Sequence, residues 1–172
     1  MNTRYAAELV PTLLAAFSAV IGLATGTAQR LWTVATVALT GVALGIAWFG
    51  DDSDGSPDRL LTVVAGVVAV AGGGLVTTQV FGIVDRASPV RRAGEVLRGG
   101  AWIGALERLA VYVALVAGWG PGLAIVLAVK GLGRYPELRS QEDSGAAERF
   151  IIGTFTSVLW AVACVGLAVL PT

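Results

Sequence analysis

Long apolar stretches without a charged residue constrain this chain more than any other feature of its sequence. Each of four such stretches is as long as the roughly 20 residues that a helix needs to cross a bilayer core. Of the 172 residues, 55% are hydrophobic and 14% are charged, which is too apolar for an ordinary soluble domain. The stretches are Leu9 to Gln29, Leu31 to Gly50, Leu60 to Val84, and Phe150 to Thr172. We therefore expect an all-α, polytopic integral membrane protein with four long transmembrane helices.

A fifth apolar run, Leu109 to Val129, is interrupted by glycine and proline. Proline breaks a helix and glycine permits tight turns, so the interruption predicts a chain reversal. The turn would consist of Gly118, Trp119, Gly120, Pro121 and Gly122. A single kinked span is the alternative, but we expect a short broken helical hairpin, which brings the number of helices to six.

The arms of the expected hairpin are Ile103 to Gly118 and Pro121 to Arg134. At helical rise they reach roughly 20 to 24 Å, which is less than the thickness of the bilayer core. The hairpin is therefore expected either to be re-entrant or to thin the bilayer around it.

The distribution of basic residues predicts an orientation, because short loops rich in Lys and Arg stay on the cytoplasmic side. The third long helix is followed by a loop with Arg86, Arg91, Arg92 and Arg98. The apolar run that forms the hairpin ends at Val129 and is followed by Lys130, Arg134, Arg139 and Arg149. A hairpin keeps both segments cytoplasmic, with the N-terminus outside, in the inner (plasma) membrane. Arg86, Arg91, Arg92 and Arg98 are also placed to bind anionic lipids of the bilayer.

The chain is expected to form a single membrane domain over residues 1–172. Residues 1–99 would be its three-helix N-terminal part, and residues 100–172 the hairpin with the last helix. The first apolar run has features of a signal peptide, with Arg4 before it and a Gly-Thr-Ala sequence from Gly26. We expect it to be retained as the first helix.

Glu107 and Arg108 are the charged residues of the stretch WIGALERLAVYVALVAG. A charge within hydrocarbon costs a few kcal/mol or more, so such residues lie at the surface, pair with a partner or perform a task. For a turn centred near Gly120, residues whose numbers add to about 240 lie opposite each other along the two arms. Glu107 should then lie near Lys130 or Arg134, in a charged layer on the cytoplasmic side. The layer would consist of Glu107, Arg108, Lys130, Arg134 and Glu148.

Three segments carry a resemblance to known proteins: GAWIGALERL from Gly100, AVKGLGR from Ala128 and AERFIIGTFTS from Ala147. They resemble the closing membrane segment of a bacterial membrane protein family of unknown function. Its motifs are Ile-Gly-x-Leu-Glu-Arg, Ala-x-Lys and Ile-Gly-Thr, and the resemblance extends over about residues 100 to 170. It implies that the five charged residues act as a set, and it implies no activity.

Other features limit the chemistry. The chain contains no histidine and a single cysteine, Cys164, within the last apolar run. Catalytic triads with histidine, histidine zinc sites and haem ligation by histidine are thereby excluded, and we expect no metal site and no cofactor. Twelve basic and twelve acidic residues balance, so nothing suggests a nucleic-acid partner.

Small residues predict close helix packing. Gly41 and Gly45 form a Gly-xxx-Gly pattern, and Gly72 to Gly74 interrupt the third long helix. Both sites are expected to be packing faces, and Gly41 and Gly45 also suit self-association into a homo-oligomer. Trp160 lies well inside the last apolar run and is expected to pack against a neighbouring helix.

Three functions fit these observations. The first is a non-catalytic structural or subunit module, whose charged layer locks the hairpin to the last helix. The second is a small oligomeric transporter or channel with its site in the broken hairpin. There Glu107 would take protons or cations, and Lys130 and Arg134 would attract an anion. The third is a lipid-modifying enzyme with Glu107 as general acid and Arg108 as oxyanion partner, although no nucleophile accompanies them.

Overall fold

The computed structural model describes residues 3–25, 28–49, 59–87, 98–139 and 146–169. They form six helices, of which the third is built from three consecutive segments. The elements are α1 (Thr3–Thr25), α2 (Gln29–Phe49), the third helix of α3 (Arg59–Val67), η1 (Val68–Gly72) and α4 (Gly73–Ala87), then α5 (Arg98–Val116), α6 (Gly120–Arg139) and α7 (Ala146–Val169). Among them, α1, α2, the third helix and α7 are long and apolar enough to cross a membrane. The predicted all-α class, with six helices of which four are long and apolar, is confirmed.

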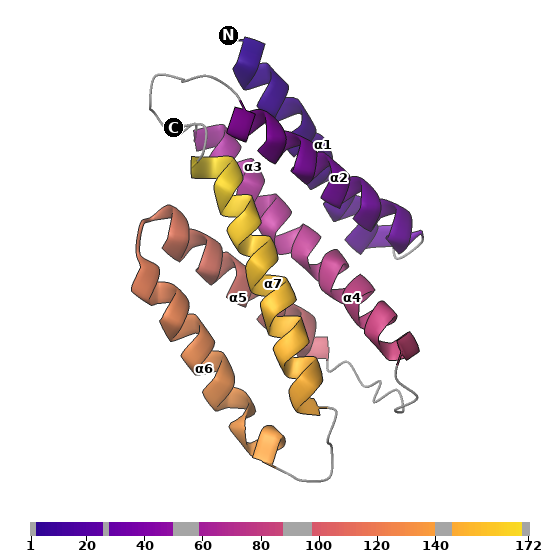
Figure 1. Cartoon of the computed structure of the whole chain (residues 1–172), viewed down its shortest axis with the longest axis vertical. Helices are drawn as coiled ribbons and strands as arrows, with labels where there is room; N and C mark the ends of the chain where they lie inside the picture. The colour runs from indigo at the N-terminus through magenta and orange to yellow at the C-terminus, as the bar shows by residue number, and fades with distance from the viewer. Residues whose placement is uncertain (1–2, 26–27, 50–58, 88–97, 140–145, 170–172) are drawn as a thin grey trace.

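The helices run alternately up and down between two ends of a bundle (Figure 1). At one end lie the start of α1, the end of α2, the start of α3, the turn between α5 and α6, and the end of α7. The bundle is organised around α7, which packs against α5 and against both halves of the third helix. In contrast, α6 packs mainly on α5 and only lightly on α7, so it lies at the edge of the molecule.

The first two helices pack along a seam of small and polar residues. The buried residues of α2 recur every three or four positions, and they are Thr33, Thr36, Thr40, Ala43 and Ala47. The Thr36 hydroxyl lies 2.8 Å from the Ser18 hydroxyl of α1 and forms a hydrogen bond with it between the two helices. Small side chains let the two backbones approach closely, which is how helices associate in the absence of a hydrophobic driving force.

Gly41 and Gly45 lie away from this seam. A side chain added at either position would meet nothing within 4 Å. The expected packing of these glycines against another helix of the chain is therefore wrong, because α2 uses the face with Thr36 and Thr40 instead. The self-association expected through Gly41 and Gly45 stays a prediction.

The apolar core is built around the third helix. Ala65, Val68 and Ala69 of the third helix pack in one buried cluster with Ala15 of α1 and Cys164 of α7. Each of these five residues has no exposed surface. Cys164 is thus an apolar packing residue in the centre of the molecule.

The interrupted apolar run is a hairpin. Helix α5 ends in a Schellman motif: Gly118 has a φ of +70°, and the Trp119 amide donates to the Ala114 carbonyl over 2.8 Å. Helix α6 begins at Gly120, with Pro121 in its first turn, where a missing amide proton does no harm. The single kinked span is excluded, and the reversal predicted at this site is confirmed.

The arms of the hairpin are longer than expected. Helix α5 has 19 residues and α6 has 20, which is about 30 Å each at helical rise. The expectation of short arms is therefore wrong. The expected first arm began at Ile103, whereas α5 begins at Arg98, and the expected second arm ended at Arg134, whereas α6 continues to Arg139. Arginine is a good helix former, so it does not by itself end a helix.

Candidate functional site

A π-helical segment lies in the middle of the third helix. The segment η1 comprises Val68–Gly72 and is followed directly by Gly73 and Gly74. A π turn bonds each carbonyl to an amide five residues on, which distorts the regular ladder and makes backbone carbonyls accessible to side chains. Two carbonyls of this segment accept hydrogen bonds from side chains of other helices.

Arg108 of α5 provides the first of these donors. Its Nε donates to the Val70 carbonyl over 2.9 Å, and its Nη1 lies 3.5 Å from the Ser157 hydroxyl of α7. The side chain is only 8% exposed, which is unusual for arginine. Arg108 therefore joins α5 to the third helix and to α7 from a buried position.

The glycines after the π segment make room for this arginine. A Cβ atom at Gly73 would collide with Arg108 Cδ and would lie 3.0 Å from Trp160 Cδ1. A Cβ atom at Gly72 would lie 2.8 Å from Trp160 Cζ2. The Gly72 to Gly74 stretch is thus the packing face that the sequence predicted.

Aromatic side chains provide two further donors to the third helix. Trp160 of α7 donates from Nε1 to the Val68 carbonyl over 3.0 Å. Tyr112 of α5 donates from its hydroxyl to the Thr62 carbonyl over 2.6 Å. The expectation that Trp160 packs against a neighbouring helix is confirmed. Together with Arg108, these residues attach α5 and α7 to the backbone of the third helix.

Glu107 points the other way, toward α6. Its carboxylate forms an ion pair with the Lys130 ammonium, and both side chains are about four-fifths buried. Lys130 is one of the two partners that the hairpin register predicted for Glu107. The turn is centred on Gly118, slightly before the assumed Gly120, so Lys130 comes level with Glu107. The Lys130 ammonium also lies 5.9 Å from the centre of the Phe150 ring, within range of a cation–π contact.

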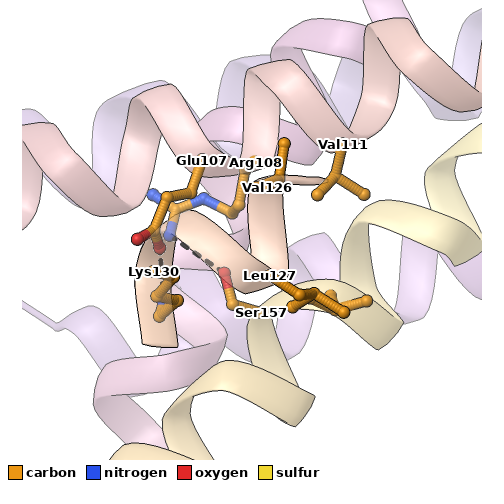
Figure 2. Close-up of a pocket in the computed structure, with 8 residues that line it drawn as sticks. Glu107, Arg108, Val111, Val126, Leu127, Lys130 and Ser157 are labelled. Carbon is orange, nitrogen blue, oxygen red and sulfur yellow. Dashed lines mark hydrogen bonds and ion pairs between the residues drawn. The ribbon is translucent and has the colours of Figure 1, made fainter. Parts of the chain in front are cut away.

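A small hollow lies where α5, α6 and α7 meet. Its volume is about 10 Å³, which is room for about one water molecule. Figure 2 shows the polar ends of Glu107, Arg108, Lys130 and Ser157 gathered on one side of it. The rest of its lining is apolar and consists of Val111, Val126, Leu127 and Val158.

The polar cluster lies at the middle of the helices that form it. Glu107 and Arg108 are at the midpoint of α5, Lys130 is at the midpoint of α6, and Ser157 is at that of α7. The sequence predicted a charged layer on the cytoplasmic side of the membrane, and that depth stays a prediction. Within the hairpin, Glu107 lies further from the helix ends than expected, because α5 begins at Arg98 rather than at Ile103 and α6 continues beyond Arg134.

Two members of the expected set lie apart from this cluster. Glu148 is in the first turn of α7 and exposed, nine residues before Ser157, which is about 14 Å along the helix. Arg134 is one helical turn beyond Lys130 and exposed. The hollow is lined by Glu107, Arg108 and Lys130, but by neither Arg134 nor Glu148.

Arg91 and Arg92 lie outside the described residues. Arg86 and Arg98 belong to the helical backbones of α4 and α5, but their side chains also lie outside the described part of the structure. Their contact with anionic lipid stays a prediction.

Sequence reasoning missed that backbone carbonyls of the third helix accept hydrogen bonds from side chains of α5 and α7. Val68 and Val70 act through backbone carbonyls, which leave no mark in the side-chain pattern. Tyr112 and Ser157 were also not singled out as parts of the site. The run of three glycines in an apolar helix was the one signal, since it indicated that something approaches the backbone closely there.

Comparisons with known proteins add no relative. No family model, no curated protein and no solved structure matches the chain. The resemblance of residues 100–170 to a bacterial membrane protein family therefore stays a prediction, and the site is interpreted from its own geometry.

Proposed function

We propose that this chain is a non-catalytic integral membrane protein, a structural or subunit module whose polar cluster locks the α5–α6 hairpin to the bundle. The hydrogen bond from Arg108 to the Val70 carbonyl carries this proposal. A charged side chain directed at the backbone of another helix fixes the position of both. The Glu107–Lys130 ion pair extends the connection from α5 to α6, which packs on α5 but only lightly on α7.

The lock is expected to depend on both members of the ion pair. Removal of one partner strands the other in a medium of low dielectric constant, which costs more than the intact pair contributes. We therefore expect Glu107→Gln and Lys130→Met each to lower the free energy of unfolding by about 1–3 kcal/mol. The double variant should lose clearly less than the sum of the two single variants.

The chain contains a built-in probe for this experiment. Cys164 is the single cysteine and has no exposed surface, so a thiol-reactive dye labels it only when the bundle opens. Thermal unfolding in detergent micelles would be followed by this labelling, with Glu148→Gln as the matched control for loss of an exposed carboxylate. The locking role would be contradicted if the double variant lost the sum of the two single losses in free energy of unfolding. It would also be contradicted if each single variant lost no more than Glu148→Gln.

A second candidate function is transport of an ion or small solute, with the chain as a small oligomeric transporter or channel. The observation that favours it is the position of the Glu107–Lys130 pair and the hollow at mid-helix. Ionisable residues at the centre of membrane helices mark ion and proton pathways in many membrane proteins. Proteoliposomes with verified insertion would be tested for flux of protons, halides and alkali ions. Flux that Glu107→Gln abolishes supports transport, and flux equal to that of empty liposomes speaks against it.

The proposed orientation places the basic segments in the cytoplasm and the N-terminus outside, in the plasma membrane. The support is the excess of arginine in residues 85–98 and in the segment after the hairpin. Single cysteines introduced by Ser53→Cys or Ser88→Cys in a Cys164→Ala background would test it in intact cells. A membrane-impermeant maleimide should label the first variant directly and the second only after lysis, and the reverse pattern would invert the topology.

Anionic lipids are proposed partners of Arg86, Arg91, Arg92 and Arg98. Each basic residue near a charged bilayer surface contributes about 1 kcal/mol of attraction. The thermal midpoint should therefore rise when phosphatidylglycerol replaces phosphatidylcholine in nanodiscs. An Arg91→Gln, Arg92→Gln variant should lose part of that rise, and an unchanged rise would argue against these residues.

A further inference from the structure

The hollow between α5, α6 and α7 carries more positive than negative charge. Arg108 and Lys130 contribute two positive charges, and Glu107 contributes one negative charge, which leaves a sum of +1. The Glu107 carboxylate is bonded to Lys130, and no carboxylate among the described residues forms an ion pair with Arg108. In the membrane placement that we propose, a net charge buried between these helices is costly, so an anion in the hollow would be stabilising.

Arg108 also has donors to spare. A guanidinium carries five N–H donors in a fixed fork. The Nε proton goes to the Val70 carbonyl, and Nη1 is 3.5 Å from the Ser157 hydroxyl, at the outer limit of a hydrogen bond. Among the described residues no other acceptor bonds this guanidinium. The Ser157 hydroxyl, which Figure 2 shows directed at Arg108, is a further donor at the same place.

The size of the hollow limits the ligand. A volume of about 10 Å³ suits a single water-sized species and excludes phosphate, sulfate and organic acids. A halide is slightly larger than water, so the proposed binding requires the walls of the hollow to move outward by a few tenths of an ångström, and α6, which packs only lightly on α7, forms one of these walls. The apolar side chains that complete the lining suit a weakly hydrated ion of one charge.

We propose that this hollow binds a small monovalent anion of halide size, with Arg108, Lys130 and Ser157 as its ligands. The anion neutralises the cluster and takes the hydrogen-bond donors that the protein leaves open. The proposal rests on the membrane placement in the proposed function, but it does not rest on the locking role of the ion pair.

The test compares chloride with gluconate, which is too large for the hollow. Purified full-length protein in micelles would be held at constant ionic strength while sodium chloride replaces sodium gluconate. The thermal midpoint, followed through Cys164, should rise with chloride in a saturable manner. The chloride NMR line should broaden in the presence of protein, which reports binding without unfolding.

Variants of the ligands separate this site from any other. Ser157→Ala removes one hydrogen bond and should weaken chloride binding about five-fold. Thr78→Ala is the matched control, because that hydroxyl is exposed and bonds the Gly74 carbonyl of its own helix. Lys130→Met brings the sum of charges to zero and should abolish binding.

Glu107→Gln gives the sharpest test because two effects have opposite signs. The variant removes the repelling carboxylate, so chloride should bind several-fold more tightly, even though the protein without chloride becomes less stable. If the cluster had only a structural role, Glu107→Gln would lower the stability without any gain in chloride affinity.

Two results would overturn the proposal. Equal thermal midpoints in chloride and gluconate, with an unbroadened chloride line, would show that the hollow holds no halide. A chloride effect that persists unchanged in both Ser157→Ala and Lys130→Met would place the anion elsewhere. Either result leaves the coupling between Glu107 and Lys130 to be judged from the double variant, so failures of the two proposals are distinguishable.

Discussion

The guanidinium of Arg108, at the middle of α5, donates to the backbone carbonyl of Val70 in the third helix over 2.9 Å. The contact joins residues 38 positions apart and brings a charged side chain to the π segment. The neighbouring residue, Glu107, faces α6 instead and pairs with Lys130. With the contact of Arg108 to Ser157 of α7, these two adjacent residues connect α5 to three other helices.

Gly73→Ala should destabilise the protein, because the added methyl group collides with Arg108 and approaches Trp160. The backbone of Gly73 has helical angles, so the effect is steric rather than conformational. We expect a loss of about 1–3 kcal/mol in the free energy of unfolding, measured by labelling of Cys164 during heating.

Gly82→Ala in the same helix is the control for Gly73→Ala. Gly82 is exposed with nothing within 4 Å, so alanine should be neutral or stabilise the helix by up to about 1 kcal/mol. Equal responses of the two variants would show that the close approach at Gly73 is not a stability determinant.

Trp160→Phe should lower the free energy of unfolding by about 1 kcal/mol, because it keeps the ring but removes the donor to the Val68 carbonyl. Trp102→Phe is the matched control, since Trp102 is 74% exposed. Circular dichroism is the suitable measurement, as it does not depend on tryptophan emission. If both variants unfold at the wild-type temperature, the hydrogen bond to the π segment contributes nothing measurable.

Gly118→Ala should cost about 1–2 kcal/mol, because position 118 has a φ of +70°, which residues with a Cβ atom adopt only under strain. Gly120→Ala, two residues on, meets open space and has no such φ, so it should be close to neutral. The comparison is made by thermal unfolding in micelles. A neutral Gly118→Ala variant would mean that the turn can rearrange without loss.

Gly41→Leu should disrupt self-association if a second copy of the chain packs on this face of α2. Because nothing lies within 4 Å of Gly41 in the single chain, the substitution should leave the thermal midpoint nearly unchanged. Cross-linking yield in native membranes measures the effect, with Gly82→Leu as the control at another open glycine. Equal cross-linking in the wild type and in both variants would argue against an interface at Gly41.

The sequence by itself determined the features that depend on local chemistry. Apolar length predicted the four long helices, since about 20 apolar residues form a helix that buries its own backbone polar groups. Glycine and proline at Gly118 to Gly122 predicted the reversal, and the register of the two arms predicted Lys130 or Arg134 as the partner of Glu107, of which the structure has Lys130. Each of these inferences depends only on residues that are close in the sequence or that face each other across one turn.

Only the tertiary structure decided where the cluster lies and what Arg108 contacts. Charge patterning predicted a layer on the cytoplasmic side, whereas Glu107 and Lys130 lie at the midpoints of α5 and α6, because these helices extend beyond Ile103 and Arg134. The partners of Arg108 and Trp160 are carbonyls of a π segment. Every residue has a carbonyl, so sequence alone cannot single out Val68 and Val70 as acceptors. That choice depends on how the third helix distorts when α5 and α7 pack against its glycines.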